Sequence, residues 1–407
     1  MATSQPSTEQ VRELGRAVDD FVRGETAWAG CDRAKRRELL HQIHAATTQH
    51  AAAWVHAAVA HKKLPKDSPP VGEEWITGPY PVQTSLGALA ASVEALEESR
   101  SPVDGFSFGR APGGRVSVRV LPHSIWDQLL LNGFSAELRM PPGVTKETVR
   151  SRAGLALLRP AETKGVGVVL GAGNITSTPI LDVVYELHAT NRVVAYDCVA
   201  SLAVVISSAW AQKDRLPAHL RAALSDPGPA LDGAYFAPVL AVLELPGSPH
   251  QFLDDAVRTA NETFTGTPGA NLIAHPRTVA PLGPAPDDAI AALRYGTVAL
   301  NAWPGVGYLT ATATWGAYPG HTLDDVQSGI GVGHNALLLD GPERTVVRGP
   351  FRPASRAILH GEPVMPPRPP WFVTNRTADT TGRLLADFAA APRRSALPRV
   401  FASALRG

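Results

Sequence analysis

The sequence predicts an α/β protein, and three observations carry that prediction. Short apolar runs alternate with amphipathic helical segments between residues 165 and 301. A turn containing Gly171 and Gly173 follows the first of these runs. The N-terminal segment 8–62 instead places apolar side chains at helical spacing. Strands that alternate with helices are typical of a largely parallel sheet covered by helices.

The composition excludes several classes of protein. The 407 residues are 44% apolar and 18% charged, as in a folded globular chain. The formal net charge is only +1, so no overall excess of charge is available to bind nucleic acid or an anionic membrane. The two cysteines cannot form a disulfide framework, the chain starts without a signal peptide, and no apolar run is long enough to span a bilayer. We therefore expect a cytoplasmic protein.

Residues 1–164 are predicted to form an N-terminal helical region with a β-hairpin. Helices are expected over 8–62 and near 83–98, and glycines around RVSVRV at 115–120 predict the hairpin. Thr145 is a plausible N-cap for a helix that follows Pro141 and Pro142. The helical segment also carries five histidines at His41, His44, His50, His56 and His61. No nearby acidic or cysteine ligands complete a metal site, so solvent-facing histidines are favoured.

Residues 165–197 predict one reduced, Rossmann-like βαβ unit. KGVGVVLGAGN is a buried strand that leads into a glycine turn, ITSTPILDVVYELHAT is a helix, and NRVVAY is a second strand. Residues 198–350 then predict an α/β domain of catalytic type. Residues 199–208 are a buried strand or helix, and 212–226 is an amphipathic helix.

After residue 235, predicted strands and helices alternate regularly. Strands are expected over 236–245, 269–275 and 295–301, and helices over 248–262 and 286–294, with Ser248 as an N-cap. Residues 351–407 are predicted to be an arm and tail rich in Pro and Arg. The arm is expected to be extended and the tail to be frayed and solvated, although a basic amphipathic tail can also dock on another subunit.

Several of these segments together resemble the aldehyde dehydrogenase superfamily. VVLGAGNITSTPILDVVYELHATNRVV resembles its first βαβ unit, and YDCVASLAVVI resembles the region around its nucleophilic cysteine. FAPVLAVLEL, GANLIAHPR and LRYGTVALNAW follow in the order of its catalytic domain. The resemblance touches most of residues 35–375. It implies an aldehyde-dehydrogenase-like fold with a truncated nucleotide-binding unit, a parallel-sheet catalytic-type domain and an N-terminal helical region. The RVSVRV hairpin resembles the strands that pair subunits in that family, which implies a homo-oligomer.

The chain also departs from the family. The stretch between Asn174 and Cys198 is long enough for only one helix and one strand. The family's ribose-binding lysine, the glycine-turn helix beneath the pyrophosphate and the Glu-Leu-Gly segment of the general base have no counterpart there. The family's Glu-x-Phe would fall near residues 233–235, where the glutamate is missing. The chain looks like an internally shortened, divergent bacterial member of the family.

The resemblance assigns roles to individual residues. Cys198 would be the nucleophile and Asn174 a donor to the oxyanion. Gly171 and Gly173 would contact NAD or NADP, although they supply only two of the three glycines of a dinucleotide fingerprint. From the residues alone, Cys198 is also consistent with buried packing and Asn174 with a helix N-cap.

Asn301 and Trp303 resemble a segment that lines the family's substrate entrance, and ordinary strand-end packing is their alternative. Glu186, His188 and Asp197 are the candidates nearest Cys198 in sequence for a general base. The first two are expected to face solvent near a helix end. A further cluster lies in the loop PGHTLDDVQSGIGVGH, where hydrogen-bonded loop structure is favoured over metal binding or catalysis: His321, Asp324, Asp325 and His334.

The functional hypothesis is a cysteine enzyme that forms a covalent adduct with an aldehyde or acyl-thioester carbonyl. It is nominally an NAD(P)-linked oxidoreductase. If the cofactor does not bind, the same adduct serves acyl transfer, hydrolysis or condensation, because only hydride removal requires the nicotinamide. The alternative of another class is a non-catalytic scaffold or partner subunit. Neither nucleic acid nor a membrane is expected as a partner.

Overall fold

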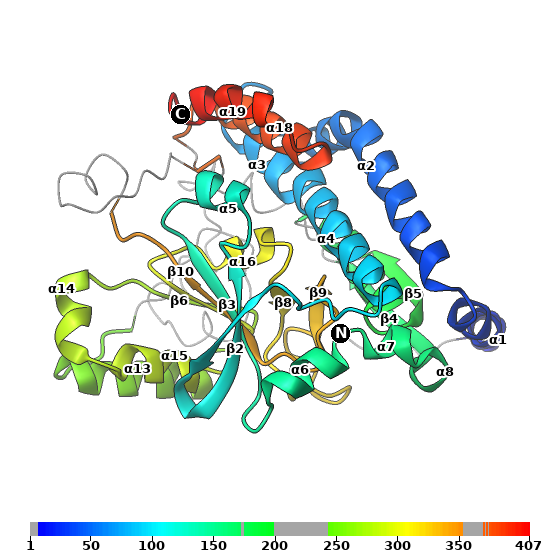
Figure 1. The fold of residues 1–407 in the computed structure, drawn as a ribbon, viewed down its shortest axis with the longest axis horizontal. Helices are drawn as coiled ribbons and strands as arrows, with labels where there is room; N and C mark the ends of the chain where they lie inside the picture. The colour runs from blue at the N-terminus through cyan, green and yellow to red at the C-terminus, as the bar shows by residue number, and fades with distance from the viewer. Residues whose placement is uncertain (1–6, 172–174, 199–242, 353–368, 371, 373) are drawn as a thin grey trace.

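The computed structural model describes residues 7–171, 175–198, 243–352, 369–370, 372 and 374–407. It is a mixed α/β structure in which a six-stranded sheet lies beside a layer of long helices, with a two-stranded parallel sheet at one end (Figure 1). None of the described helices is both long enough and apolar enough to cross a membrane. The expected strand at 236–245, apart from its last residues, and the expected elements at 199–226 lie outside the described residues.

The N-terminal region is helical, as the sequence predicts. Asp32 caps the second helix, because its side chain accepts a hydrogen bond from the backbone N–H of Lys35 (2.7 Å). On its buried face, Leu40 packs with Val82 of α4, whereas Ala51 and Val55 pack with Trp75 of α3. The helices of this region are α1 (Thr8–Ala29), α2 (Arg33–His61), α3 (Pro70–Thr77) and α4 (Pro79–Glu97).

The six-stranded sheet is mixed rather than largely parallel. Its order is β1-β2-β3-β10-β7-β6. Strands β6, β7 and β10 are parallel to one another, whereas β3, β2 and β1 continue the sheet antiparallel. The antiparallel half contains the hairpin that the sequence predicts at 115–120. The six strands are β1 (Ser107–Ala111), β2 (Arg115–Leu121), β3 (Ser135–Arg139), β6 (Gly269–Leu272), β7 (Thr297–Leu300) and β10 (Arg344–Arg348).

Shorter elements connect and cover these strands. Thr145 and Ser248 cap α6 and α13 as predicted, by accepting hydrogen bonds from the backbone N–H of Thr148 and Gln251. The connecting helices are α5 (Ile125–Leu130), α6 (Lys146–Arg152), α7 (Leu155–Leu158), α8 (Pro160–Thr163), α13 (Pro249–Thr263), α14 (Pro276–Val279), α15 (Ala285–Ala292) and α16 (Gly305–Leu309). A small antiparallel pair is formed by β8 (Thr314–Gly316) and β9 (Val332–Asn335).

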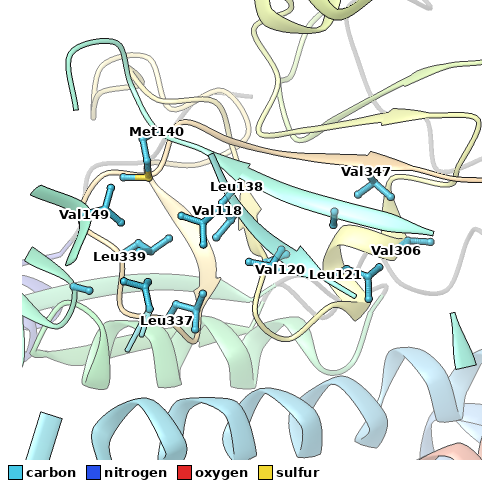
Figure 2. Packing of buried hydrophobic residues seen from close by; sticks show 14 of the residues in the cluster. Val118, Val120, Leu121, Leu138, Met140, Val149, Val306, Leu337, Leu339 and Val347 are labelled. Carbon is cyan, nitrogen blue, oxygen red and sulfur yellow. The ribbon is translucent and has the colours of Figure 1, made fainter. Parts of the chain in front are cut away.

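The largest apolar cluster joins both halves of the six-stranded sheet. Val118 and Leu138 come from the antiparallel strands, Val347 comes from β10, and Leu337 and Leu339 follow β9 (Figure 2). All five side chains are buried. Residues on either side of position 165 therefore share one core, because strands from both regions pair within one sheet.

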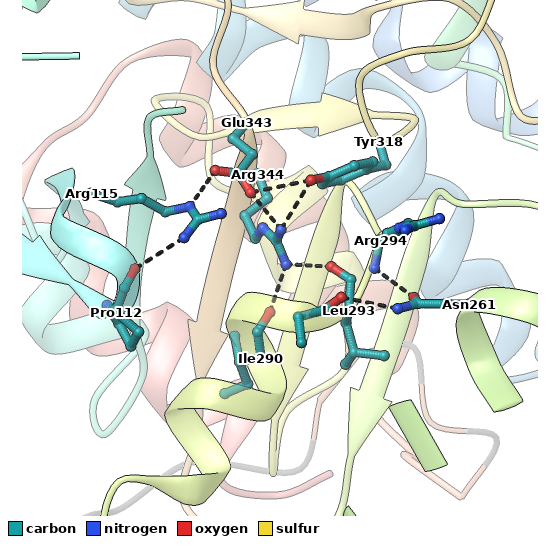
Figure 3. A network of polar contacts seen from close by, with 10 residues as sticks. Pro112, Arg115, Asn261, Ile290, Leu293, Arg294, Tyr318, Glu343 and Arg344 are labelled. Carbon is teal, nitrogen blue, oxygen red and sulfur yellow. Dashed lines mark hydrogen bonds and ion pairs between the residues drawn. The ribbon is translucent and has the colours of Figure 1, made fainter. Parts of the chain in front are cut away.

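A buried arginine fixes the start of the interior strand β10 to α15. Arg344 donates hydrogen bonds to the backbone oxygens of Ile290 (2.6 Å) and Leu293 at the end of that helix (Figure 3). Its other nitrogen contacts Glu343, which also accepts from Arg115 (2.6 Å). Burial alone would raise the pKa of Glu343, but the hydrogen bonds from Arg115 and Arg344 outweigh burial and lower it.

The C-terminal residues fold back onto the N-terminal helices, so the expectation of a frayed tail is wrong. Helix α18 (Ala378–Ala390) packs on α3 and is followed by α19 (Leu397–Ala404). The two backbones approach closely at Gly72, where an added Cβ would lie under 3.0 Å from backbone atoms of Ala378. Trp75 Nε1 donates to Asp379 across the same interface (2.8 Å). The arm at 353–368 lies outside the described residues.

Candidate functional site

The site is built on the predicted βαβ unit. Strands β4 (Gly165–Gly171) and β5 (Arg192–Cys198) are parallel, and α9 (Thr178–His188) connects them. Their register pairs Gly171 with Cys198, so both strands end at the same edge. Ligands of α/β proteins bind outside this carboxyl edge. Gly173, Asn174 and the side chain of Cys198 lie outside the described residues, as does the side chain of Asp197.

The start of α9 is enclosed by three other helices. Trp54 Nε1 of α2 donates to Thr176 Oγ1 (2.9 Å). Ser177 is completely buried, and its hydroxyl donates to the backbone oxygen of Thr77 in α3. Since that hydroxyl has one proton, its contact with Tyr308 of α16 is a hydrogen bond that the tyrosine donates. This N-terminus is therefore closed by side chains.

This enclosure bears on the cofactor that the sequence analysis implies. A dinucleotide in the usual arrangement directs its pyrophosphate to the free N–H groups at a helix N-terminus. In α9 the N-cap residue Ser177 is buried, and Pro179 supplies no N–H. The described residues at the start of α9 therefore do not fit a pyrophosphate in that arrangement.

Tyr308 connects two strand ends that are far apart in sequence. It lies in α16, seven residues after Asn301, where β7 has just ended, and it contacts Ser177, which follows the end of β4 at Gly171. The segment that follows the carboxyl end of β7 is thereby joined to the segment that follows the carboxyl end of β4. Sequence reasoning missed both residues, although a tyrosine within GVGYLT and a serine in the first turn of the predicted helix are the available signals.

Three titratable groups lie at this connection, the buried Tyr308 and His334 and the half-buried Asp182. Burial raises the pKa of Tyr308 to about 12 and lowers that of His334 to about 4. Their rings meet edge to face, with centroids 5.5 Å apart. Burial, followed by the nearby Glu186, raises the pKa of Asp182 to about 7. An added Cβ at Gly333 would lie 2.5 Å from Oδ1 of Asp182, so this carboxyl group packs directly against the backbone of β9.

Asn301 has a structural role at the end of β7. Its side-chain amide accepts from the backbone N–H of Ala274 (2.9 Å) and donates to the oxygen of the same residue (3.0 Å). Its own backbone lies in the left-handed region, with φ 54°. Trp303 is partly exposed and covers Gly305, where an added Cβ would lie under 3.0 Å from the indole ring. These contacts correspond to the strand-end packing that the sequence analysis left open.

The candidates for a general base have other partners. Glu186 accepts from Thr190 Oγ1 (2.7 Å). His188 is buried rather than solvent-facing, so that expectation is wrong. Its ring meets the edge of Trp28 with centroids 5.5 Å apart, and burial, followed by the charge of Arg36, lowers its pKa to about 3. His188 thus belongs to the interface between α9 and the first two helices.

The predicted loop cluster divides into separate contacts. His321 shares a hydrogen bond with Thr267 Oγ1 (2.7 Å), and Asp325 accepts from Gln327 (2.7 Å). His334 lies in β9 and is buried. The hydrogen-bonded loop that the sequence favours is confirmed for His321 and Asp325. Within the part of the chain that the structure describes, no three His, Cys, Asp or Glu side chains gather closely enough to hold a metal ion.

Comparisons with known proteins identify no relative: no family model, no curated protein and no solved structure matches this chain.

Proposed function

We propose that this protein is a cysteine-dependent enzyme of aldehyde-dehydrogenase type that acts on the carbonyl of an aldehyde or an acyl thioester. One observation carries the proposal: β5 ends at Cys198, beside Gly171, at the carboxyl edge of a parallel βαβ unit. The sequence places Asn174 shortly after Gly171. A thiol and a carboxamide thus follow neighbouring strand ends.

The proposed chemistry begins with attack of the Cys198 thiolate on the carbonyl carbon. A carbon–sulfur bond forms while the carbonyl π electrons move to oxygen, and the Asn174 amide donates to that oxyanion. With an acyl thioester, collapse of the adduct expels the substrate thiolate, which takes up a proton, and leaves an acyl-cysteine. Water or a second nucleophile then attacks the acyl group and regenerates the thiol.

We favour acyl transfer or hydrolysis over dehydrogenation. The resemblance implies NAD or NADP, but the buried Ser177 and Pro179 at the start of α9 do not fit its pyrophosphate. Acyl transfer requires only the cysteine and the oxyanion donor. The resemblance therefore supports the covalent step, and the enclosed helix start favours the version without a nicotinamide.

A non-catalytic scaffold is the second candidate. It is favoured by Asn301, one of the residues proposed to line the substrate entrance, because both polar atoms of its amide are used on Ala274. A protein that retains such contacts for stability alone would keep its fold without turning over a substrate.

Acylation measured on intact protein by mass spectrometry separates these candidates. The protein is incubated with a short acyl thioester. We expect one added acyl group on the wild type and on Cys31→Ala, and none on Cys198→Ala. Cys31 is the matched control because the chain has no third cysteine. Absence of acylation on the wild type would support the scaffold. Calorimetric titration with NAD and NADP, with no heat of binding expected, tests the choice between acyl transfer and dehydrogenation.

A further inference from the structure

The first helix carries an exposed aliphatic face. Val11, Val18 and Val22 are 55%, 49% and 51% exposed, and they lie on one side of α1 together with Gly15. An added Cβ at Gly15 would meet nothing within 4 Å. The three exposed valines form an apolar ridge that is interrupted at Gly15. Exposure of such an apolar surface to water is unfavourable, and burying it against a partner is favourable.

The neighbouring strand has an uncovered face. Register pairs Val166 of β4 with Val193 of β5, so both point to the side where Gly24 of α1 packs on Val193. On that side Val168 is 72% exposed and Val166 is 38% exposed. Helices normally cover both faces of a parallel sheet. Here α9 covers one face, and α1 packs on β5 and less extensively on β4 across the other, where it leaves Val168 exposed.

The two apolar surfaces are neighbours. Lys164, just before β4, forms an ion pair with Glu25 of α1 (3.1 Å). Figure 1 shows α1 beside β4 and β5 at one end of the molecule. We name the five exposed valines, Val11, Val18, Val22, Val166 and Val168, the α1–β4 patch.

We propose that the α1–β4 patch binds a second copy of this chain, with α1 of each copy antiparallel to α1 of the other. A two-fold axis beside the midpoint between residues 16 and 17 places Val11 opposite Val22 of the second copy. The same axis places Val18 over the gap at Gly15 of the second copy. A surface that is complementary to itself in this way is typical of a two-fold dimer.

Charge supports the same register. Arg12 lies beside the ridge, exposed and paired with Glu9 of its own helix (2.7 Å), and Asp19 is exposed too. In the antiparallel arrangement Arg12 is about two residues, or about 3 Å, along the helix axis from Asp19 of the second copy. The contact occurs twice, once on each side of the axis. Opposite charges thus flank the apolar ridge at both ends.

The area predicts a dimer that dissociates on dilution. Helix α1 has 22 residues, so it is about 33 Å long and presents a face of roughly 330 Å² if about 10 Å wide. Two such faces and the valines of β4 together bury on the order of 1,000 Å², which is at the lower limit for a specific interface.

Sedimentation velocity over a wide concentration series tests the proposal. We expect the wild type to shift from monomer to dimer as concentration rises, and Val18→Asp to remain monomeric. Arg16→Ala is the matched control, because it changes the charge by the same amount away from the patch, and it should dimerise like the wild type. A wild type that is monomeric throughout, or a Val18→Asp variant that still dimerises, would overturn the proposal.

Cross-linking keeps the proposal testable if Val18→Asp alters the fold of α1, which circular dichroism would detect. The double substitution Gly15→Cys and Val18→Cys is introduced after both native cysteines are replaced by serine. A mild oxidant should then give a covalent dimer. The same procedure with Arg16→Cys and Asp20→Cys, which lie away from the patch, should give monomer. Equal cross-linking of both pairs would exclude the α1 register.

Discussion

The contact between Gly72 and Ala378 allows a sharp prediction about the C-terminal helix. Replacing Gly72 by alanine places a methyl group under 3.0 Å from backbone atoms of α18, whereas ordinary van der Waals contact begins at 3.4 Å. The obstructing atoms belong to the backbone, so no side-chain rotation can relieve the overlap. Helix α18 would have to move away from α3 over its packed length before the methyl group could fit.

Two opposing effects determine the size of the change. Alanine is favoured over glycine inside a helix by about 1 kcal/mol. Overpacking of a close contact costs about 1–3 kcal/mol, and obstruction by backbone lies toward the upper end. An added Cβ at Gly382 would likewise lie 2.8 Å from the oxygen of Gly72, so the two helix backbones are already in close contact around this position. We expect a net loss of about 2 kcal/mol in the free energy of unfolding.

Urea unfolding followed by circular dichroism measures this loss, and limited trypsin digestion reports whether α18 is released. Gly87→Ala is the matched control. Gly87 is exposed within α4, and an added Cβ there meets nothing within 4 Å, so that variant should gain about 0.5–1 kcal/mol. A Gly72→Ala variant as stable as the wild type, or two variants that shift in the same direction, would refute this reasoning.

Three further predictions concern the buried Arg36 and two half-buried polar side chains, Asp182 and Asn301. Arg36→Met removes a buried guanidinium that donates to three backbone oxygens and to Asn191 (2.6 Å), so urea unfolding should show a loss of about 3 kcal/mol, and Arg36→Lys should lie between. In the folded protein, burial raises the pKa of Asp182 to about 7, above its value in the unfolded chain. The protonated carboxyl group therefore contributes fully to the free energy of unfolding below about pH 4, and this contribution is lost as the pH rises to 7. Asp182→Asn should remove that part of the pH dependence in urea titrations, and an unchanged slope would contradict the assignment. Asn301→Ala loses both bonds to Ala274 and keeps a left-handed backbone, so thermal unfolding should show a loss of about 2 kcal/mol, with Asn301→Gly in between.

The local elements could be predicted because their signals are local. The apolar run at 165–171, the following helix and the next strand form the βαβ unit that the sequence indicates. Thr145 and Ser248 could be predicted as caps because a hydroxyl oxygen just before a helix can accept a hydrogen bond from a backbone N–H of the first turn. Spacing and residue type were sufficient at these positions.

The mixed sheet could not be predicted in the same way. Strand β3 pairs antiparallel with β10, which comes from the far end of the chain, and neither segment shows a strong periodic pattern. The composition of the tail, rich in proline and arginine, does not predict its packing, because α18 is buried against a glycine of α3 that lies far away in the sequence. His188 was assigned to solvent because it ends a helix, but Trp28 and Arg36 cover it from distant positions. For the candidate site, the sequence supplied Cys198 and Asn174, and only the structure supplied Ser177 and Tyr308.

The pairing of α3 with α18 also affects how this protein is made. Gly72 is synthesised long before Ala378, the residue that packs against it in the folded protein. At about 5–20 residues per second, synthesis of the chain between them takes roughly 15–60 s. Throughout that interval, the side of α3 that later meets α18 lacks its partner, so newly synthesised chains should depend on chaperones that shield apolar helices.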